Sequence, residues 1–522
     1  MHHLAPAAVE PLLTDGAEIA FLDVREPGQY GAGHPFFAVN LPYSRLEALA
    51  PALLPRRSVR IVLFDDRDGV AAKAAAGLAG LGYTDLTVME GGAPAWAAAG
   101  FTLFDGVNLP SKTFGELVEH AMHTPSISAE DLGAMQTAGE DLILLDGRTP
   151  AEYRRMTIPG ARSCPDAELG YRLLGFGLGP ETRIVVNCAG RTRSIIDAQT
   201  LRNLGIPAVA LRNGTQGWEL AGLTLANGNT PEALSEPDRA AARESARRLI
   251  ASAGLTMIDR AALDRQRADA GRSHYLSDVR TAEEYAASHL ADAVHAPGGQ
   301  LVQATDQWVA VRGAAIVLSD DTGLRAATTA LWLRGMGHRV VILDADASEE
   351  PTRPVPAASP SALPRVPPAE VPVRLATGAA LLDLSQSMAY CAAHIGGARW
   401  TIRPRLAALD LAGAREILLA ARDPRVAEIA AQDLKEMHRL PVALVTGGPE
   451  DWRAAGLELV ATPDDPADAD CIDYVFHTHD RHSGNLAAAQ AYLDWETGLL
   501  ARLDEQELSV LRPELSLPDP AS

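Results

Sequence analysis

Cysteine is scarce in this chain, where only four of the 522 residues are cysteine. Four cysteines are too few for a disulfide framework in a chain of this length, and their spacing contains no Cys-x-x-Cys pair of the kind that binds zinc. They are Cys164, Cys188, Cys391 and Cys471. We therefore expect a reducing compartment, the cytoplasm, and no metal or other cofactor held by cysteine.

Long apolar runs and basic charge are also in short supply. No stretch of about 18 uncharged apolar residues occurs, so no membrane-spanning helix is expected. Residues 1–6 lack the basic segment and apolar core of a secretory signal. The chain carries 46 Lys and Arg against 67 Asp and Glu, a net charge of −21. This balance argues against a nucleic acid or an anionic membrane as partner, because both attract basic patches.

The chain does have ample material for several packed domains. Hydrophobic residues make up 47% of it, and its length suits three to five domains. Short apolar strands alternate with Ala- and Leu-rich helical stretches, for example at 71–81, 195–204 and 326–334. This alternation predicts an α/β fold in which small parallel sheets have helices on both faces.

Cys188 is the most informative residue, because it follows the apolar strand 183–187 and precedes a Gly/Arg loop and a helix. Unpaired amides and the dipole at a helix N-terminus favour negative charge, and Arg191 and Arg193 add to this field. The arrangement favours a nucleophilic thiolate. The alternative, a small buried hydrophobe, fits poorly with two arginines so close. Cysteine phosphatases need Cys-x5-Arg, and here the x5 position is Ser194.

The pattern around Cys188 recurs along the chain. Its members are a strand-end aspartate with an arginine two residues later, a Glu-Tyr pair, an Ile-Pro-Gly-Ala turn, a loop position and a Gly-Gly…Trp segment. The strand-end aspartates are Asp23, Asp146, Asp278 and Asp383, and the matching loop positions are Asp65, Cys188, Asp320 and Ala421. The two are 42 residues apart in the first three copies and 38 in the fourth. Such agreement indicates a fourfold internal repeat.

This order of motifs, with the six-residue loop 188–193, resembles the rhodanese family of sulfurtransferases. The resemblance covers most of the chain and implies four tandem rhodanese-like domains with a helical C-terminal tail. One departure is Thr157, which stands where the family usually has histidine. The expected segments are domains at 1–105, 126–227, 250–345 and 373–461, a Pro-rich linker at 351–372 and the tail at 463–522.

The resemblance also implies a chemistry. Cys188 would carry a sulfane sulfur as a persulfide, taken from a small anionic donor such as thiosulfate or 3-mercaptopyruvate and passed to a thiol or protein-cysteine acceptor. No cofactor is implied. The loop residues expected to bind the donor are Ala189, Gly190, Arg191, Thr192 and Arg193, with Asp146 and Arg148 in support. The copies with Asp65, Asp320 and Ala421 lack a sulfur nucleophile and are expected to be inactive scaffolds.

Two other functions stay open. One is a non-catalytic persulfide carrier or multidomain scaffold. The other is a phosphatase or arsenate reductase on the same fold, which the short loop disfavours. Cys164, just beyond the Ile-Pro-Gly-Ala turn, is either a second thiol that exchanges sulfur with Cys188 or a small residue in a tight turn. Cys391 and Cys471 are expected to be structural.

The tail contains three histidines close together, His477, His479 and His482. Their spacing superficially resembles the His-x-His-x-Asp-His motif of metal-dependent hydrolases, but the aspartate stands one place early. The alternative is a loop that packs the tail, followed by an amphipathic helix at about 485–503. No metal site is assigned here.

Overall fold

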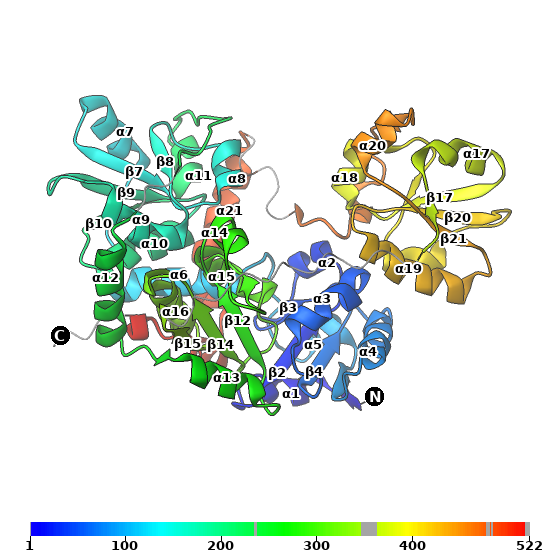
Figure 1. Ribbon diagram of the computed structural model, residues 1–522, viewed down its shortest axis with the longest axis horizontal. Coiled ribbons are helices and arrows are strands. Elements are labelled where there is room, and N and C mark those ends of the chain that lie inside the picture. The colour runs from blue at the N-terminus through cyan, green and yellow to red at the C-terminus, as the bar shows by residue number, and fades with distance from the viewer. Residues whose placement is uncertain (1, 234–236, 346–362, 477–480, 482–483, 517–522) are drawn as a thin grey trace. The chain divides into compact units, whose positions relative to one another are not determined.

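The computed structural model describes residues 2–233, 237–345, 363–476, 481 and 484–516. Four five-stranded sheets follow one another along the chain (Figure 1). All four have the same strand order, in which the first strand of the copy lies at one edge and the second and third lie at the other. The predicted α/β class with four repeated domains is confirmed.

The strands are short. Copy 1 has β1 (His2–Leu4), β2 (Ile19–Asp23), β3 (Val39–Asn40), β4 (Arg60–Phe64) and β5 (Leu86–Met89). Copy 2 has β6 (Ser126–Ile127), β7 (Leu142–Asp146), β8 (Ala161–Ser163), β9 (Arg183–Asn187) and β10 (Ala208–Leu211). Copy 3 has β11 (Met257–Ile258), β12 (His274–Asp278), β13 (Val294–His295), β14 (Ala315–Ser319) and β15 (Arg339–Leu343). Copy 4 has β16 (Arg365–Val366), β17 (Ala379–Asp383), β19 (Arg399–Trp400), β20 (Glu416–Ala420) and β21 (Val442–Val445), with an antiparallel pair β18 (His394–Ile395) and β22 (Leu459–Val460).

Helices flank the sheets. Copy 1 has α1 (Pro6–Val9), α2 (Pro27–Ala32), α3 (Leu46–Leu53), α4 (Val70–Gly80) and α5 (Gly92–Ala98), and α6 (Leu109–Met122) follows it. Copy 2 has α7 (Ala129–Ala138), α8 (Pro150–Arg155), a 3-10 turn η3 (Asp166–Glu168), α9 (Leu169–Arg172), α10 (Thr192–Asn203) and α11 (Gly214–Leu220). Copy 3 is preceded by α12 (Arg239–Ser252) and has α13 (Arg260–Ala268), α14 (Ala282–Ala287), α15 (Gly298–Gln303) and α16 (Leu324–Gly335). Copy 4 has α17 (Val371–Ala376), α18 (Ser387–Ala392), α19 (Pro424–Met437) and α20 (Pro449–Ala454), and the tail has α21 (Leu486–Gly498) and α22 (Glu505–Leu508).

Each central strand is buried on both sides, as parallel sheets require. In β9, Val185 packs into one apolar core with Trp218, whereas Ile184 and Val186 pack into a second core across the sheet. The run of branched apolar residues therefore serves two cores at once. The strand ends directly before the loop position, so that Cys188 stands at the carboxyl edge of its sheet.

A glycine closes the loop from the other side. Gly214 begins α11 with φ +53°, and a Cβ built on it would lie 2.2 Å from the carbonyl oxygen of Cys188. In copy 1, a Cβ on Gly92 would lie 2.0 Å from the carbonyl oxygen of Asp65. The Gly-Gly…Trp segment of the repeat therefore exists because only glycine lets this turn approach the loop.

The chain divides into two compact units that do not follow sequence order. The first unit contains copies 1 and 4, and the second contains copies 2 and 3 together with residues 478–522. Within the first unit, Arg403 of copy 4 donates to Glu47 of copy 1 at 2.6 and 3.0 Å. The same guanidinium binds Asp433 at 2.8 Å.

Two expected boundaries need correction. The predicted linker 351–372 is too long, because β16 at Arg365–Val366 pairs with β21 and closes the fourth sheet. Copy 4 therefore begins before residue 373, and residues 346–362 lie outside the described part. Residues 106–125, which fall between the first two predicted domains, contain α6, and this helix packs against α10 of copy 2.

Candidate active site

Cys188 lies at the first position of the loop between β9 and α10. Its side chain is buried, with 2% of its surface exposed. The thiol donates to the Ser194 hydroxyl, with a sulfur–oxygen distance of 3.6 Å. Ser194 in turn donates to the carbonyl oxygen of Arg191 at 2.8 Å. The loop thus curls around the sulfur, with the N-terminus of α10 directed at it.

The copies that have aspartate at the position of Cys188 show what the amides around this loop can bind. In copy 3, the carboxylate of Asp320 accepts hydrogen bonds from the backbone amides of Thr322 at 3.2 Å and Arg325 at 2.8 Å, and from that of Gly323. In copy 1, the Asp65 carboxylate accepts from two loop amides in the same way, each at 2.9 Å. The loop is therefore an anion cradle, and in these two copies it is filled by its own first side chain.

The same cradle is open in copy 2. The amides of Gly190 and Arg191 correspond to those of Thr322 and Gly323, and within the described residues neither has a hydrogen-bond acceptor. A thiol cannot accept from them as a carboxylate does. These two amides of copy 2 are thus left without the carboxylate that their counterparts bind in copy 3.

Arg191 is held by carboxylates outside the loop. Its Nε and Nη2 donate to Glu116 of α6 at 2.7 and 2.9 Å, and Nη2 also contacts Glu119. Burial lowers the pKa of this guanidinium, but the bonds to Glu116 more than offset it and raise the pKa above its usual value. Arg191 therefore ties the loop to α6.

Arg193 forms a two-pronged ion pair with Glu152 at the start of α8. Its two terminal nitrogens donate to the carboxylate at 2.9 and 2.7 Å. Burial alone would raise the pKa of Glu152, but Arg193 holds it well below the usual value. Copy 3 repeats the pair at the same repeat positions, where Arg325 donates to Glu284 at 2.7 Å. Because the pair occurs beside an aspartate as well as beside a cysteine, its evident role is to fix the loop.

Asp146 and Arg148, predicted to support the site, form a buried ion pair at the end of β7. The guanidinium donates to the carboxylate at 2.9 and 2.7 Å. Thr157 donates to the same carboxylate at 2.7 Å, which explains how the chain accommodates threonine where the family usually has histidine. The residue between them, Gly147, donates to the carbonyl of Asn187 at 3.0 Å. The pair therefore orders the backbone next to Cys188.

The other thiols lie in different surroundings. Cys164 is completely buried in the apolar core that contains Leu145 and Val186. Burial, followed by the charge of Glu168, raises the pKa of its thiol well above the usual value. These surroundings favour the structural interpretation of Cys164. Cys391 and Cys471 are also buried free thiols, both in the first unit.

The tail covers the loop, which the sequence did not reveal. Glu496 of α21 accepts from the Thr192 hydroxyl at 2.7 Å and from the Lys112 ammonium at 3.1 Å. Lys112 also binds the Tyr492 hydroxyl. Glu496 is almost completely buried, and a Cβ built on Gly190 would lie 2.9 Å from its Oε2. Helix α21 therefore lies directly against the loop.

A second missed feature is a pair of buried carboxyl groups, Asp166 of η3 and Asp197 of α10. A comparison of the copies could have indicated them, because copy 3 has the uncharged residues Gly298 and Thr329 at the positions of these two aspartates. His477, His479 and His482 lie outside the described residues. Among the residues that are described, no group of three or more His, Cys, Asp or Glu could hold a metal ion.

The repeat agrees with known proteins. The model of the rhodanese-like domain matches residues 6–99, 128–221 and 260–349, more than half of the chain. The chain belongs to the rhodanese family. The crystal structure of a thiosulfate sulfurtransferase from Pseudomonas aeruginosa is 40% identical over 98% of this chain and 99% of that one, with a TM-score of 0.90.

Other rhodanese-like structures match more weakly. The Alr3790 protein from Anabaena sp. is 25% identical over 20% of this chain and 93% of its own, with a TM-score of 0.19. An anaerobic ergothioneine biosynthesis enzyme from Chlorobium limicola is 16% identical over 66% and 95%, with a TM-score of 0.24. No curated protein matches the chain. No helix in the described ranges is both long enough and apolar enough to cross a membrane.

Proposed function

We propose that this rhodanese-family sulfurtransferase moves a sulfane sulfur through a persulfide on Cys188. The open cradle of copy 2 carries the proposal. The amide at the position of Gly190 binds a carboxylate in the copies with Asp65 and Asp320, and the amide at the position of Arg191 does so in the copy with Asp320. Within the described residues of copy 2, neither amide has an acceptor. A persulfide on Cys188 would place its terminal, negatively charged sulfur where those carboxylate oxygens lie.

The reaction proceeds by double displacement. The Cys188 thiolate attacks the outer sulfur of the donor, the sulfur–sulfur bond of the donor breaks, and the leaving group departs with the electron pair. Thiosulfate fits as donor, because it is a small anion, its leaving group is sulfite, and the relative from Pseudomonas aeruginosa is a thiosulfate sulfurtransferase. The acceptor then attacks the outer sulfur and releases the Cys188 thiolate.

The loop residues have distinct roles in this proposal. The amides of residues 189–193 bind the donor and the persulfide, as preorganised donors do for developing charge. The guanidiniums of Arg191 and Arg193 hold the loop through Glu116 and Glu152, so they shape the cradle and set its field. Asp146 and Arg148 support the strand ends beneath it.

The test is to expose the protein to thiosulfate and then locate the added sulfur by mass spectrometry. We expect one extra sulfur per chain, on the peptide that contains Cys188, with release of sulfite. Cys188→Ser should abolish both while the far-ultraviolet spectrum stays unchanged. Cys164→Ser is the matched control and should load normally. Sulfur on Cys164 alone, or more than a few percent of turnover in Cys188→Ser, would contradict the proposal.

A further inference from the structure

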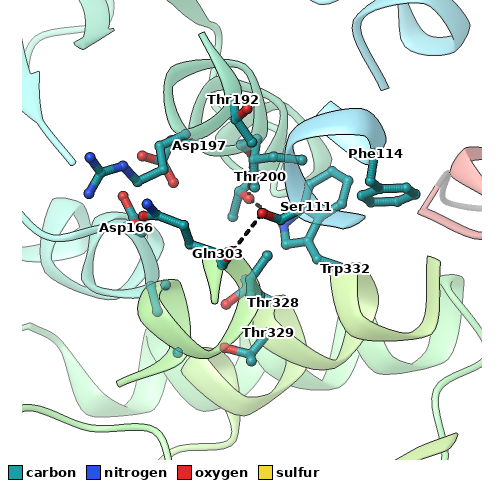
Figure 2. A pocket seen from close by; sticks show the side chains of 16 residues that line it. Ser111, Phe114, Asp166, Thr192, Asp197, Thr200, Gln303, Thr328, Thr329 and Trp332 are labelled. Atoms are coloured by element: carbon teal, nitrogen blue, oxygen red, sulfur yellow. Dashed lines mark hydrogen bonds between the residues drawn. The ribbon is translucent and has the colours of Figure 1, made fainter. Parts of the chain in front are cut away.

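A small cavity lies where copies 2 and 3 pack together within the second unit (Figure 2). Its volume is about 30 Å³, which is enough for about two water molecules. Helices α6, α10, α15 and α16 contribute to its wall. Figure 2 shows Asp166 and Asp197 on one side and Thr328 and Thr329 on another.

The two carboxyl groups form a pair. Both reach the same point beside Gly147, and Asp166 Oδ1 and Asp197 Oδ2 have no hydrogen-bond partner among the described residues. Thr329 is 2% exposed, lines the same cavity, and its hydroxyl also has no partner in the part of the chain that is described. Buried polar groups that face a shared space without partners indicate that the space holds water.

The pair lies next to the backbone that carries the thiol. A Cβ built on Gly147 would lie 2.2 Å from Asp197 Oδ2 and 2.8 Å from Asp166 Oδ1. Gly147 in turn donates to the carbonyl of Asn187, the residue before Cys188. Only copy 2 combines these features, since copy 3 has Gly298 and Thr329 in place of the two aspartates. The carboxyl pair therefore accompanies the cysteine.

The charged neighbours of the pair are few. Arg193, itself bound to Glu152, attracts both carboxylates, and a thiolate on Cys188 repels Asp197. The negative charge of Asp197 also contributes to the raised pKa of the Cys164 thiol. The cavity wall from α6, α15 and α16 brings only neutral side chains.

These surroundings leave one proton on the pair near neutral pH. Burial raises the pKa of Asp166 to about 6. Burial, followed by the neighbouring Asp166, raises the pKa of Asp197 well above its usual value. Two buried carboxyl groups that lie this close together hold a proton between them, because the repulsion between two buried charges opposes ionisation of both. At pH 7 to 8 the pair therefore has one ionised carboxylate that can accept a second proton.

We propose that the Asp166–Asp197 pair takes up the proton that a thiol acceptor loses when it removes sulfur from Cys188, and that water in the cavity carries this proton. This proposal rests on the persulfide function above. The acceptor S–H bond breaks and its proton goes to the ionised carboxylate. The acceptor sulfur bonds to the outer sulfur of the persulfide, the sulfur–sulfur bond to Cys188 breaks, and its electron pair stays on the Cys188 thiolate. No external oxidant or reductant is needed.

The test compares two acceptors, because only a thiol has a proton to lose. The protein is loaded with thiosulfate, separated from excess donor, and mixed with either reduced glutathione or sulfite. In Asp197→Asn and Asp166→Asn we expect transfer to glutathione at pH 7 to slow by about 10- to 100-fold, at or below the low end for a lost general base. Loading, and transfer to sulfite at pH 8, should stay within about twofold. The defect with glutathione should shrink toward pH 9, where thiolate is abundant.

Asp320→Asn is the matched control, because it removes a buried carboxylate from copy 3, which has no cysteine at the loop position. In this variant the ratio of the transfer rate to glutathione over that to sulfite should equal the wild-type ratio. Asparagine keeps the shape of the side chain and brings no new charge into the buried site, so folding should persist, and thermal melting checks this. If one variant does not fold, the other carries the same test. Equal slowing with both acceptors, or no slowing with glutathione, overturns the proposal. If wild type fails to load, the persulfide function itself is wrong.

Discussion

Substitutions of Arg193 and of its counterpart in copy 3, Arg325, distinguish two roles for a loop arginine, which are to fix the loop or to bind the sulfur donor. Replacing Arg193 by alanine removes two charge-assisted hydrogen bonds to Glu152, whose side chain is 37% exposed. Water can partly take the place of Arg193 there, so we expect a loss of about 2 kcal/mol in the free energy of unfolding. Arg325 is completely buried and serves Glu168, Glu284 and Asp321. It also lies 3.7 Å from the Asp320 carboxylate, so its loss leaves four carboxylates close together and should cost about 3–5 kcal/mol.

Urea unfolding and steady-state kinetics with thiosulfate measure the two effects on the same variants. If Arg193 only fixes the loop, the KM of Arg193→Ala for thiosulfate should change by no more than about threefold. A guanidinium that binds the donor directly would instead contribute about 1.5–3 kcal/mol, and its loss would raise KM by about 10- to 100-fold. Arg325→Ala should be the less stable variant and keep the wild-type KM.

Glu152→Gln decides between the two roles, because it releases the Arg193 guanidinium without removing it. A freed donor ligand would lower the KM for thiosulfate, whereas a loop-fixing residue would not. A tenfold rise in KM for Arg193→Ala, together with a lower KM for Glu152→Gln, would refute the structural role assigned to this ion pair.

Three further outcomes are expected. Asp320→Ala should leave the rate of sulfur transfer within about twofold of wild type. It should lower the urea midpoint, because the loop amides of copy 3 and Arg325 lose a buried acceptor worth about 2–4 kcal/mol. A large loss of turnover would show that copy 3 takes part in the reaction. Glu496→Gln should lower the free energy of unfolding by about 3 kcal/mol, because the buried Lys112 ammonium loses its anion. The double variant Glu496→Gln/Lys112→Met should regain part of this loss. An unchanged urea midpoint in Glu496→Gln would contradict a stabilising role for the ion pair. Burial raises the pKa of Glu26 to about 7, from 4.5 when unfolded, despite the hydrogen bonds from Ser44. The folded protein thus holds more protons between these values, so stability should fall as pH rises from about 4.5 to 7, by up to about 3 kcal/mol. Urea midpoints at pH 4.5 and 7.5 should show this fall in wild type and lose it in Glu26→Gln; an equal pH dependence in both would count against it.

The repeat itself could be predicted from the sequence alone. Parallel strands buried on both faces need apolar stretches such as the one within Arg183–Asn187. Each stretch ends at a loop position that lies 42 residues after the strand-end aspartate in three copies and 38 in the fourth. The residue at that position then predicts which copy can hold sulfur in the proposed reaction. A thiol at Cys188, carboxylates at Asp65 and Asp320 and a methyl group at Ala421 can be recognised without coordinates, because the chemistry depends on residue type at one position.

Only the tertiary structure shows which carboxylates the loop arginines contact. Arg191 and Arg193 both precede or begin a helix near a thiol, and the sequence favours donor binding for both. Their guanidiniums are instead bound by Glu116 and Glu152, which lie 75 and 41 residues away in sequence. Which carboxylate meets which arginine depends on how separate elements pack, and no local periodicity encodes that.

The same reason explains the other features that were missed. Copies 1 and 4 share one compact unit and copies 2 and 3 the other, an arrangement that the order of near-identical motifs does not specify. Helix α21 follows the last copy in sequence, yet Glu496 contacts Thr192 in the second. Asp166 and Asp197 lie 31 residues apart on separate elements, and become a pair only when η3 and α10 meet beside Gly147. Local sequence specifies the strands, the helices and the candidate nucleophile, whereas side-chain partners are specified only by the packed surfaces that bring distant residues together.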